Sequence, residues 1–233
     1  MLENKVIAIT GASGGVGAEL CLKLAKKGAK LVIGSNDAVK MQILKDQLKN
    51  LNCDFLDTIL DVTEENQVKS FIESAVKKYG KIDMLFNLAG LSIPGQISEF
   101  DLDKYDTTMD VNLKGTFLCS KHFVALHDAE EDGLIVNIGS MAAKRANGNA
   151  PLYCVAKASV NMFSKGLAIQ CQAKNIRVTT VNPGGADTDF WGTRQVDRSK
   201  LMKAEDIADV LVFIGDNSDK VVIHEIDFEA FNK

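Results

Sequence analysis

The 233-residue sequence lacks proline-rich linkers, internal repeats and low-complexity segments. Its three prolines stand far apart, at positions 94, 151 and 183. The composition therefore marks no boundary between domains. We expect a single domain over residues 1–233, because open α/β sheets of roughly 200–250 residues often fold as one unit.

The sequence also lacks a charge excess that would draw it to a polyanion. It has 27 Lys and Arg residues against 31 Asp and Glu residues, for a formal net charge of −4. Proteins that hold a phosphate backbone carry a basic field on one face. We therefore expect no nucleic acid partner.

Long hydrophobic runs are missing as well. Residues 1–5 lead straight into a short apolar stretch, and no segment approaches the roughly 18 apolar residues of a membrane span. We expect no membrane segment and a cytoplasmic location.

Cysteine and histidine are sparse and show neither disulfide nor metal-ligand spacing. The cysteines stand at 21, 53, 119, 154 and 171, and the histidines at 122, 127 and 224. Without a Cys-x-x-Cys pair or an even-numbered framework, the cysteines are expected to be reduced thiols. We expect no metal site.

The sequence does contain a regular alternation of short runs rich in Val, Ile and Leu with longer amphipathic segments. The predicted strands are 5–10, 30–34, 54–60, 82–87, 133–139, 176–181 and 220–226. The predicted helices are 15–27, 37–50, 64–79, 99–127, 151–174 and 204–214. This alternation is typical of βαβ units and predicts an α/β fold, with one doubly wound parallel sheet and helices on both faces.

A glycine-rich segment follows the first predicted strand directly. Its glycines at 11, 15 and 17 have no Cβ atom, so the chain can turn tightly there. Backbone amides at the start of the next helix can then approach a pyrophosphate. Such turns also serve only to pack a helix on a strand, and the position after the first strand is what favours a dinucleotide site.

A second motif is Tyr153-x-x-x-Lys157, on a predicted helix opened by Pro151. Side chains at i and i+4 project from one face of a helix, so a phenol and an ammonium can share one pocket. Ser140 follows the predicted strand 133–139, and ligands of open α/β sheets bind outside the carboxyl ends of strands. These three side chains are therefore candidates for one site.

In their order along the chain, these motifs resemble those of the classical short-chain dehydrogenase/reductase family, over nearly the whole length. Thr10-Gly11-x-x-x-Gly15-x-Gly17 resembles its cofactor loop, and Pro183-Gly184 with Thr188 its nicotinamide segment. The residues that match its catalytic four are Asn112, Ser140, Tyr153 and Lys157. The cofactor contacts implied are Gly11, Ser13, Gly15, Val16, Gly17, Ser35, Asn36, Asp61, Val62, Asn87, Ala89, Gly90, Tyr153, Lys157, Pro183, Gly184 and Thr188.

The resemblance implies a Rossmann fold and an NAD(P)-dependent oxidoreductase that interconverts a carbonyl compound and a secondary alcohol. Tyr153 is then the general acid, and Ser140 donates a hydrogen bond to the carbonyl oxygen. Lys157 is expected to lower the pKa of Tyr153 and, by resemblance, to bind ribose hydroxyls, while Asn112 holds a water molecule. The resemblance also implies a homodimer or homotetramer.

Other interpretations stay open at this point. Taken singly, Asn112 can bond backbone carbonyls, Tyr153 can be a buried anchor, and Asp61 can cap the helix 64–79. The chain can also be a catalytically silent dinucleotide sensor or scaffold. An isomerase of the same superfamily is a third class, although such proteins usually carry a larger carboxyl-terminal domain.

The choice between NAD and NADP depends on the end of the second predicted strand. By resemblance, an acid at Ser35 would favour NAD, and arginine at Asn36 or Gly14 would favour NADP. The sequence has neither, and Asp37 is interpreted as a first-turn acid of the helix 37–50. Because nothing at Ser35 repels a 2′-phosphate, we expect a small preference for NADP(H) over NAD(H).

The sequence does not identify the substrate beyond a small carbonyl or alcohol compound. Three segments that follow strands are expected to form the walls of its site, namely 91–96, 141–152 and 185–203. Four cations in them can meet an anionic group or can be solvated: Lys144, Arg145, Arg194 and Arg198.

Overall fold

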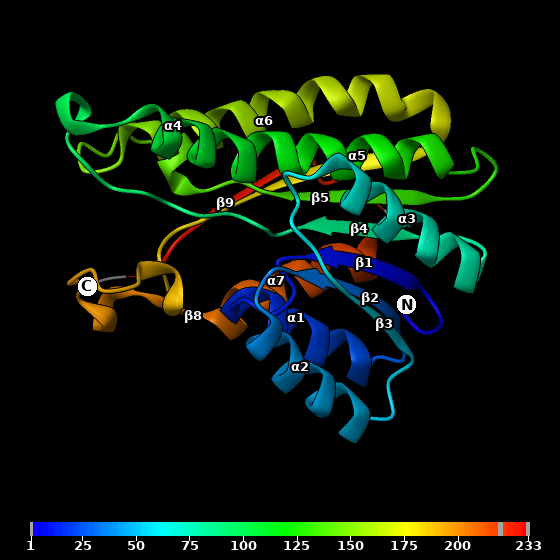
Figure 1. Ribbon diagram of the computed structural model, residues 1–233. Helices are drawn as coiled ribbons and strands as arrows, with labels where there is room; N and C mark the ends of the chain where they lie inside the picture. The colour runs from blue at the N-terminus through cyan, green and yellow to red at the C-terminus, as the bar shows by residue number, and fades with distance from the viewer. Residues whose placement is uncertain (1, 219–220, 232–233) are drawn as a thin grey trace.

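The computed structural model describes residues 2–218 and 221–231, which form a three-layer α/β structure around a parallel sheet (Figure 1). The sheet has seven strands in the order β3-β2-β1-β4-β5-β6-β9. They are β1 (Val6–Thr10), β2 (Lys30–Ser35), β3 (Phe55–Ile59), β4 (Met84–Asn87), β5 (Gly133–Ile138), β6 (Ile176–Pro183) and β9 (Glu225–Phe228). The order reverses between β1 and β4, as in a doubly wound Rossmann sheet, which confirms the predicted fold class.

Helices cover both faces of the sheet (Figure 1). One face carries α1 (Gly15–Lys26), α2 (Ala38–Asn50) and α7 (Ala204–Asn217). The other carries α3 (Glu65–Tyr79), α4 (Leu102–Met109), α5 (Gly115–Leu126) and α6 (Pro151–Cys171). Each layer of helices encloses its own hydrophobic core against the sheet.

Strand β1 shows why the apolar runs form strands in the middle of the molecule. Ile7 and Ile9 belong to the core under α1 and α7, whereas Val6 and Ala8 belong to the core under α3 and α5. Alternate side chains of a strand point to opposite faces, so a strand covered on both sides must be apolar throughout.

Two predicted elements differ from the structure. The predicted helix 99–127 is broken: α4 and α5 are separated by a π-helical turn, Asp110–Lys114, and the helical path begins at Leu102 after the cap Asp101. The predicted strand 220–226 was misplaced, because the strand that pairs with β6 is β9. Val221 and Val222 supplied the apolar signal but are each 53% exposed, and position 220 lies outside the described residues.

Two smaller elements were not predicted. β7 (Ala186–Asp187) and β8 (Met202–Lys203) form a separate two-stranded sheet beyond the end of β6. The chain between them forms a loop with two 3₁₀ turns, Asp189–Trp191 and Arg198–Lys200. This loop lies at the carboxyl end of the main sheet, on the left in Figure 1.

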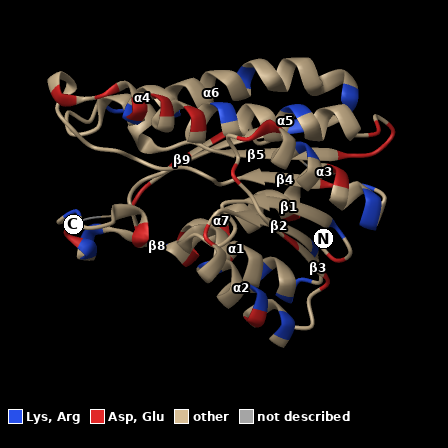
Figure 2. Ribbon diagram, viewed as in Figure 1, with Lys and Arg blue, Asp and Glu red and all other residues tan. Residues whose placement is uncertain are grey.

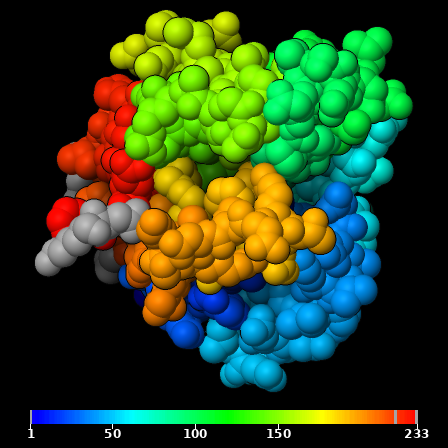
Figure 3. Space-filling view, turned by 90° about the vertical axis from the view of Figure 1, so that its left-hand side faces the viewer, coloured from blue at the N-terminus to red at the C-terminus, as the bar shows by residue number. Residues whose placement is uncertain are grey.

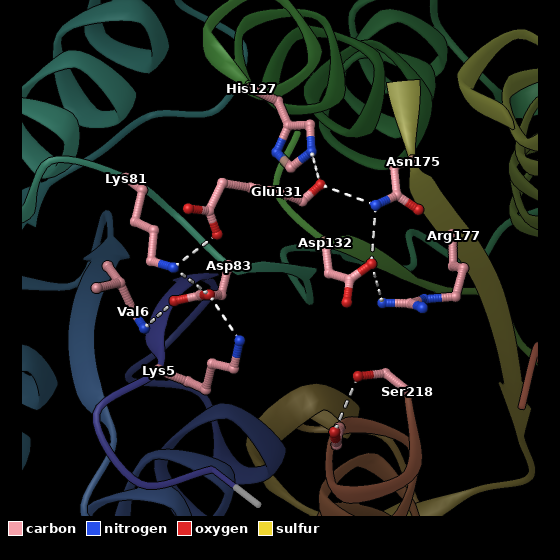
Figure 4. A network of polar contacts seen from close by, with 11 residues as sticks. Lys5, Val6, Lys81, Asp83, His127, Glu131, Asp132, Asn175, Arg177 and Ser218 are labelled. Carbon is pink, nitrogen blue, oxygen red and sulfur yellow. Dashed lines mark hydrogen bonds and ion pairs between the residues drawn. The ribbon is translucent and has the colours of Figure 1, made fainter. Parts of the chain in front are cut away.

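A network of hydrogen bonds and ion pairs connects segments at the other end of the sheet, where the strands begin (Figure 4). The Asp83 carboxylate, just before β4, accepts hydrogen bonds from Lys5 Nζ at 2.9 Å and from the Val6 amide at 2.8 Å. Lys81 Nζ lies 3.2 Å from the same carboxylate. Asp83 therefore joins the starts of β1 and β4 below the core.

Positions of Lys and Arg alternate with positions of Asp and Glu along the outer helices and loops in the view of Figure 2. Over residues 2–218 and 221–231, no helix combines the length and apolar character that crossing a bilayer requires. Within the same ranges, no cluster of three His, Cys, Asp or Glu side chains has metal-binding geometry.

Candidate active site

A cleft of about 1120 Å³ opens at the carboxyl ends of the strands. Segments that follow β1, β4, β5 and β6 line it, together with the start of α6. Figure 3 shows this end of the molecule, where the orange chain near residue 200 crosses between the amino-terminal half and the green segments above it. All three segments predicted to form the walls contribute residues to the cleft, namely 91–96, 141–152 and 185–203.

The glycine-rich turn forms one end of the cleft. Gly11 has φ of +66°, and a Cβ atom there would lie 2.8 Å from the amide nitrogen of Ala89, so only glycine fits. Helix α1 then begins at Gly15, after the cap residue Gly14. Gly14 has no side chain with which to cap the helix, and the first turn carries no acid. The amides of the first turn, Gly15–Gly17, are thus available to an anion in the cleft.

Tyr153 and Lys157 both line the cleft from α6, one turn apart. Lys157 Nζ lies 5.8 Å from the centroid of the Tyr153 ring. It donates a hydrogen bond of 2.9 Å to the carbonyl of Ile138, at the end of β5. The spacing in the sequence therefore does bring the phenol and the amine into one pocket.

The pKa values of these two groups are shifted in opposite directions, and burial is the main cause of both shifts. Burial raises the pKa of Tyr153 to about 12, while the Ser140 hydroxyl acts in the opposite direction. Burial lowers the pKa of Lys157 to about 7. The expectation that Lys157 lowers the pKa of Tyr153 is not met here, because desolvation disfavours the charged forms of both groups.

Ser140 lines the cleft, two residues after the end of β5. Its Oγ accepts a hydrogen bond of 3.1 Å from the Ala142 amide and caps a short 3₁₀ turn. Its own amide donates to Asn182 Oδ1 at 3.0 Å. Asn182, a fully buried residue of β6 that sequence reasoning missed, donates in turn to Glu225 and Asp227 of β9, at 2.8 Å each. Asn182 therefore positions Ser140.

Asn112 lies in the π-helical turn and is fully buried. Its amide nitrogen donates to the carbonyls of Leu91 and Thr108, at 2.9 and 2.8 Å. Its Oδ1 has no hydrogen-bond partner within the described ranges. A Cβ atom on Gly90 would lie 2.9 Å from this oxygen and 3.2 Å from Lys157 Nζ. The oxygen and the amine therefore flank the same small space beside Gly90.

Several predicted cofactor residues lie beyond the lining of this cleft, near the ends of β2 and β3. The hydroxyls of Ser13 and Ser35 are buried and bond each other at 2.6 Å, whereas Asn36 is exposed. Asp61 accepts two hydrogen bonds from Thr63 and does not cap α3, whose cap position is Glu64. Val62 is buried and contributes to the core beneath α3.

Asn87 and Ala89 lie at the end of β4, next to the glycine-rich turn that follows β1. The Asn87 side chain is buried and donates to Asn137 Oδ1 at 2.8 Å and to Ser120 Oγ at 3.2 Å. It therefore joins β4 to β5 and α5. The backbone of Ala89 packs against Gly11. Neither side chain belongs to the lining of the cleft.

The chain after β6 closes the cleft over the glycine turn. Pro183, Gly184 and Thr188 line the cleft, and a Cβ atom on Gly15 would lie 2.6 Å from the Thr188 methyl group. This close approach places the predicted nicotinamide segment beside the predicted pyrophosphate site.

Lys40 is a cleft residue that the sequence did not reveal. It lines the cleft from the first turn of α2 and forms an ion pair of 2.9 Å with Asp189 on the loop after β7. Asp37, interpreted as a first-turn acid, is the cap residue one position before α2 and accepts a hydrogen bond of 3.0 Å from the Lys40 amide. One lysine near a helix start looks like any solvated lysine, so no signal distinguished Lys40.

The four cations of the predicted wall segments have different partners, and of the four only Arg145 and Arg194 line the cleft itself. Lys144 pairs with Glu225, Arg145 with Glu229 and Arg198 with Asp187. Among the residues described, no carboxylate forms an ion pair with Arg194. Its guanidinium instead lies against Phe190 and Trp191. Burial lowers the pKa of Arg194 below its usual value.

Comparisons with known proteins agree with this geometry. The family model for short chain dehydrogenase matches residues 5–199. The chain is 30% identical over 226 residues to an uncharacterized oxidoreductase of Staphylococcus saprophyticus, with 97% of each chain covered. It is 31% identical over 236 residues to a (2S)-[(R)-hydroxy(phenyl)methyl]succinyl-CoA dehydrogenase subunit of Thauera aromatica, covering 97% of this chain and 94% of the relative.

A solved structure is similar over the same extent. The 3-ketoacyl-(acyl-carrier-protein) reductase from Brucella melitensis, complexed with NADH, has a TM-score of 0.88 at 28% identity and covers 98% of both chains.

Proposed function

The chain belongs to the short-chain dehydrogenase family of oxidoreductases, and from that premise we propose that it is an NAD(P)-dependent enzyme interconverting a carbonyl compound and a secondary alcohol. The observation that carries the proposal is one juxtaposition. Tyr153, Lys157 and Ser140 line the same cleft as the uncapped start of α1. A proton donor, an oxygen-binding hydroxyl and an anion site thus meet in one place.

The cleft fits a dinucleotide. The first-turn amides of α1 and the close backbone at Gly11 suit a pyrophosphate. Lys157 offers the remaining hydrogens of its amine to ribose hydroxyls, and Pro183, Gly184 and Thr188 lie at the nicotinamide end. When bound, the dinucleotide would supply or accept the hydride.

The residues of the chain would handle the proton. With its pKa raised to about 12, the Tyr153 phenol stays protonated at neutral pH, as an acid for carbonyl reduction requires. Its proton would go to the oxygen of the carbonyl as that oxygen becomes an alkoxide. Ser140 would donate a hydrogen bond to the same oxygen and stabilise the growing charge.

Asn112 supplies a site for a water molecule behind the phenol. Its buried Oδ1 lacks a partner among the described residues and faces the space that Lys157 Nζ also borders. A buried polar oxygen of this kind usually binds water. We propose that this water returns a proton to Tyr153 through Lys157.

The test is consumption of the reduced dinucleotide, followed by its near-ultraviolet absorbance, with a panel of ketones and aldehydes. The wild-type protein is expected to turn over at least one class, and Tyr153→Phe to turn over none. Tight dinucleotide binding with silence toward every carbonyl and alcohol would instead identify a nucleotide sensor.

For the cofactor, we propose a preference for NADP(H). Ser35 is neutral and buried against Ser13, and the Asp37 carboxylate is engaged at the start of α2. Ser35 therefore carries no charge that opposes a 2′-phosphate, and the Asp37 carboxylate is held at the Lys40 amide. Lys40, in the cleft wall beside them, carries the positive charge that such a phosphate would recruit.

For assembly, we propose a homodimer or homotetramer formed through α5 and α6. Phe117 is partly exposed on α5, and Met162 and Ile169 of α6 are 69% and 78% exposed. Val124 of α5 and Leu167 of α6, by contrast, pack into the core. Light scattering at micromolar concentration is expected to give a multiple of 25.3 kDa, and a value equal to it would contradict the proposal.

A further inference from the structure

Arg194 is placed in the cleft wall by aromatic stacking. Its Cζ lies 5.0 Å from the ring centroid of Trp191 and 5.3 Å from that of Phe190. Rings at this distance attract a guanidinium and restrict its plane. The side chain is therefore held in place without an acidic partner among the described residues.

The donors of Arg194 are only partly used. Nε donates to the Trp191 carbonyl at 2.8 Å, and Nη2 donates to the Phe190 carbonyl. Nη1 reaches Ser92 Oγ only at 3.5 Å, the outer limit of a hydrogen bond. A guanidinium has five N–H groups, so donors remain for a ligand in the cleft.

Arg194 also lies close to the proposed proton donor. The Phe190 ring is 5.8 Å from the Tyr153 ring, centroid to centroid, and Arg194 stacks on that same Phe190. The phenol ring and the guanidinium thus neighbour the same aromatic ring. A ligand that spans this ring can contact both ends.

We propose that Arg194 binds a carboxylate of the substrate, so that the carbonyl compound reduced beside Tyr153 is an oxo acid. This inference rests on the proposed function and specifies its substrate class. The planar fork of one arginine matches a carboxylate and its single positive charge neutralises it, whereas the same charge neutralises a phosphate dianion only in part. The neighbouring cations Lys144, Arg145 and Arg198 are held in ion pairs of their own.

The alternative is that Arg194 is a structural link, joining the loop after β7 to the loop after β4 through Ser92. The two roles differ in what they predict. If Arg194 is a structural link, its loss should weaken the binding of oxo acids and of neutral ketones equally. If Arg194 binds a carboxylate, its loss should weaken the binding of oxo acids only.

A binding test needs no turnover, because Trp191 is the single tryptophan of the chain and lies against Arg194. Titration with levulinate at constant ionic strength is expected to change tryptophan fluorescence saturably. The change should disappear in Arg194→Met and weaken in Arg194→Lys. Arg198→Met, a matched change on the same loop outside the cleft lining, should leave it intact.

A kinetic test compares acetoacetate and levulinate with their methyl esters. Arg194→Met is expected to raise KM for the better oxo acid about thirtyfold, the loss of one charge-assisted interaction, and to change KM for its ester less than about threefold. Thermal melts of both variants report whether the loop still folds.

The outcomes separate the two proposals. Saturable carboxylate binding that requires Arg194 supports this inference even if no carbonyl is turned over, which would defeat only the proposed function. No carboxylate-dependent fluorescence change in the wild-type protein overturns the inference. So does an equal rise in KM for acid and ester, because it would show a structural link.

Discussion

Asp83 and Lys157 are ionisable side chains buried at opposite ends of the strands of the same sheet, Asp83 at the amino-terminal ends and Lys157 at the carboxyl-terminal ends. Their surroundings differ. The Asp83 side chain, 2% exposed, receives the Val6 amide and lies within 3.2 Å of two lysine amines (Figure 4). As whole residues, Lys157 is 2% and Asp83 4% exposed, but Lys157 has, within the described ranges, a single hydrogen-bond acceptor, the carbonyl of Ile138.

This difference separates structural from functional burial. A buried charge that is paired and hydrogen-bonded holds elements together, and removing its partners is costly. A buried charge with few partners costs stability and is shifted in pKa, which is typical of a site that waits for a ligand. The buried charge at the amino-terminal ends of the strands therefore has the surroundings of a structural group, and the amine at the carboxyl-terminal ends those expected of the proposed active site.

Tyr153→Phe is expected to give the largest effect, at the carboxyl edge. The change removes the proposed proton donor and little binding surface, so turnover should fall about a thousandfold or more, while dinucleotide affinity stays nearly the same. Steady-state kinetics and a cofactor titration measure the two quantities. Turnover within a few-fold of wild type would remove Tyr153 from the mechanism.

Asp83→Asn tests whether the network around Asp83, at the amino-terminal ends of the strands, stabilises the fold. Its loss would leave Lys5 and Lys81 without their shared carboxylate and weaken the bond to the Val6 amide, at a cost of about 3 kcal/mol in the free energy of unfolding. Urea denaturation measures it. Because the proposed active site lies at the carboxyl-terminal ends of the strands, away from Asp83, kcat of the folded variant should stay within about twofold of wild type.

Asp209→Asn is a matched control for this prediction. Asp209 forms a surface ion pair of 2.7 Å with Lys23 and is largely exposed. Exposed pairs contribute less than about 1 kcal/mol. If the two variants lose the same free energy of unfolding, the buried network contributes no more to stability than an exposed ion pair does.

Lys157→Met is expected to stabilise the dinucleotide-free protein by about 2 kcal/mol at neutral pH while abolishing turnover. In the folded protein the pKa of Lys157 is lowered to about 7, from an ordinary value of 10.5. Between these values the unfolded chain holds a proton that the folded chain has released, so wild-type stability rises with pH.

The gain from Lys157→Met should therefore be largest at pH 7 and below, and shrink as pH approaches about 10. Thermal melts across this range, below the titration of Tyr153, measure it. A variant less stable than wild type at neutral pH would show that the amine is a structural group after all.

The sequence predicted the parts of the site that depend on local spacing. Gly11, Gly15 and Gly17 follow a strand, and Tyr153 and Lys157 are one helical turn apart. Local geometry alone brings these groups together, and the alternation of apolar runs predicts the sheet around them.

What the sequence did not predict depends on contacts between distant segments. Within the three wall segments, the other cations are held in ion pairs, such as Arg145 with Glu229, and Arg194 is the one without an acid among the described residues. No spacing in the sequence encodes that, nor the pairing of Lys40 with Asp189. The last strand was misplaced for the same reason, since its position is set by pairing with β6.

Lys40→Met should give the smallest effect, because its ion pair with Asp189 is solvent-exposed and contributes little to stability. If Lys40 turns from Asp189 to a 2′-phosphate, its loss should weaken NADPH binding about tenfold, or about 1.4 kcal/mol, and leave NADH binding within about twofold. Nucleotide fluorescence titrations with both reduced cofactors measure this.

Lys203→Met, on the neighbouring β8 but outside the cleft lining, is the matched control. Equal weakening for the two cofactors would mean that Lys40 only shapes the cleft. NADH binding more than about a hundredfold tighter than NADPH in the wild-type protein would mean that Asp37 leaves its capping position to reach the ribose.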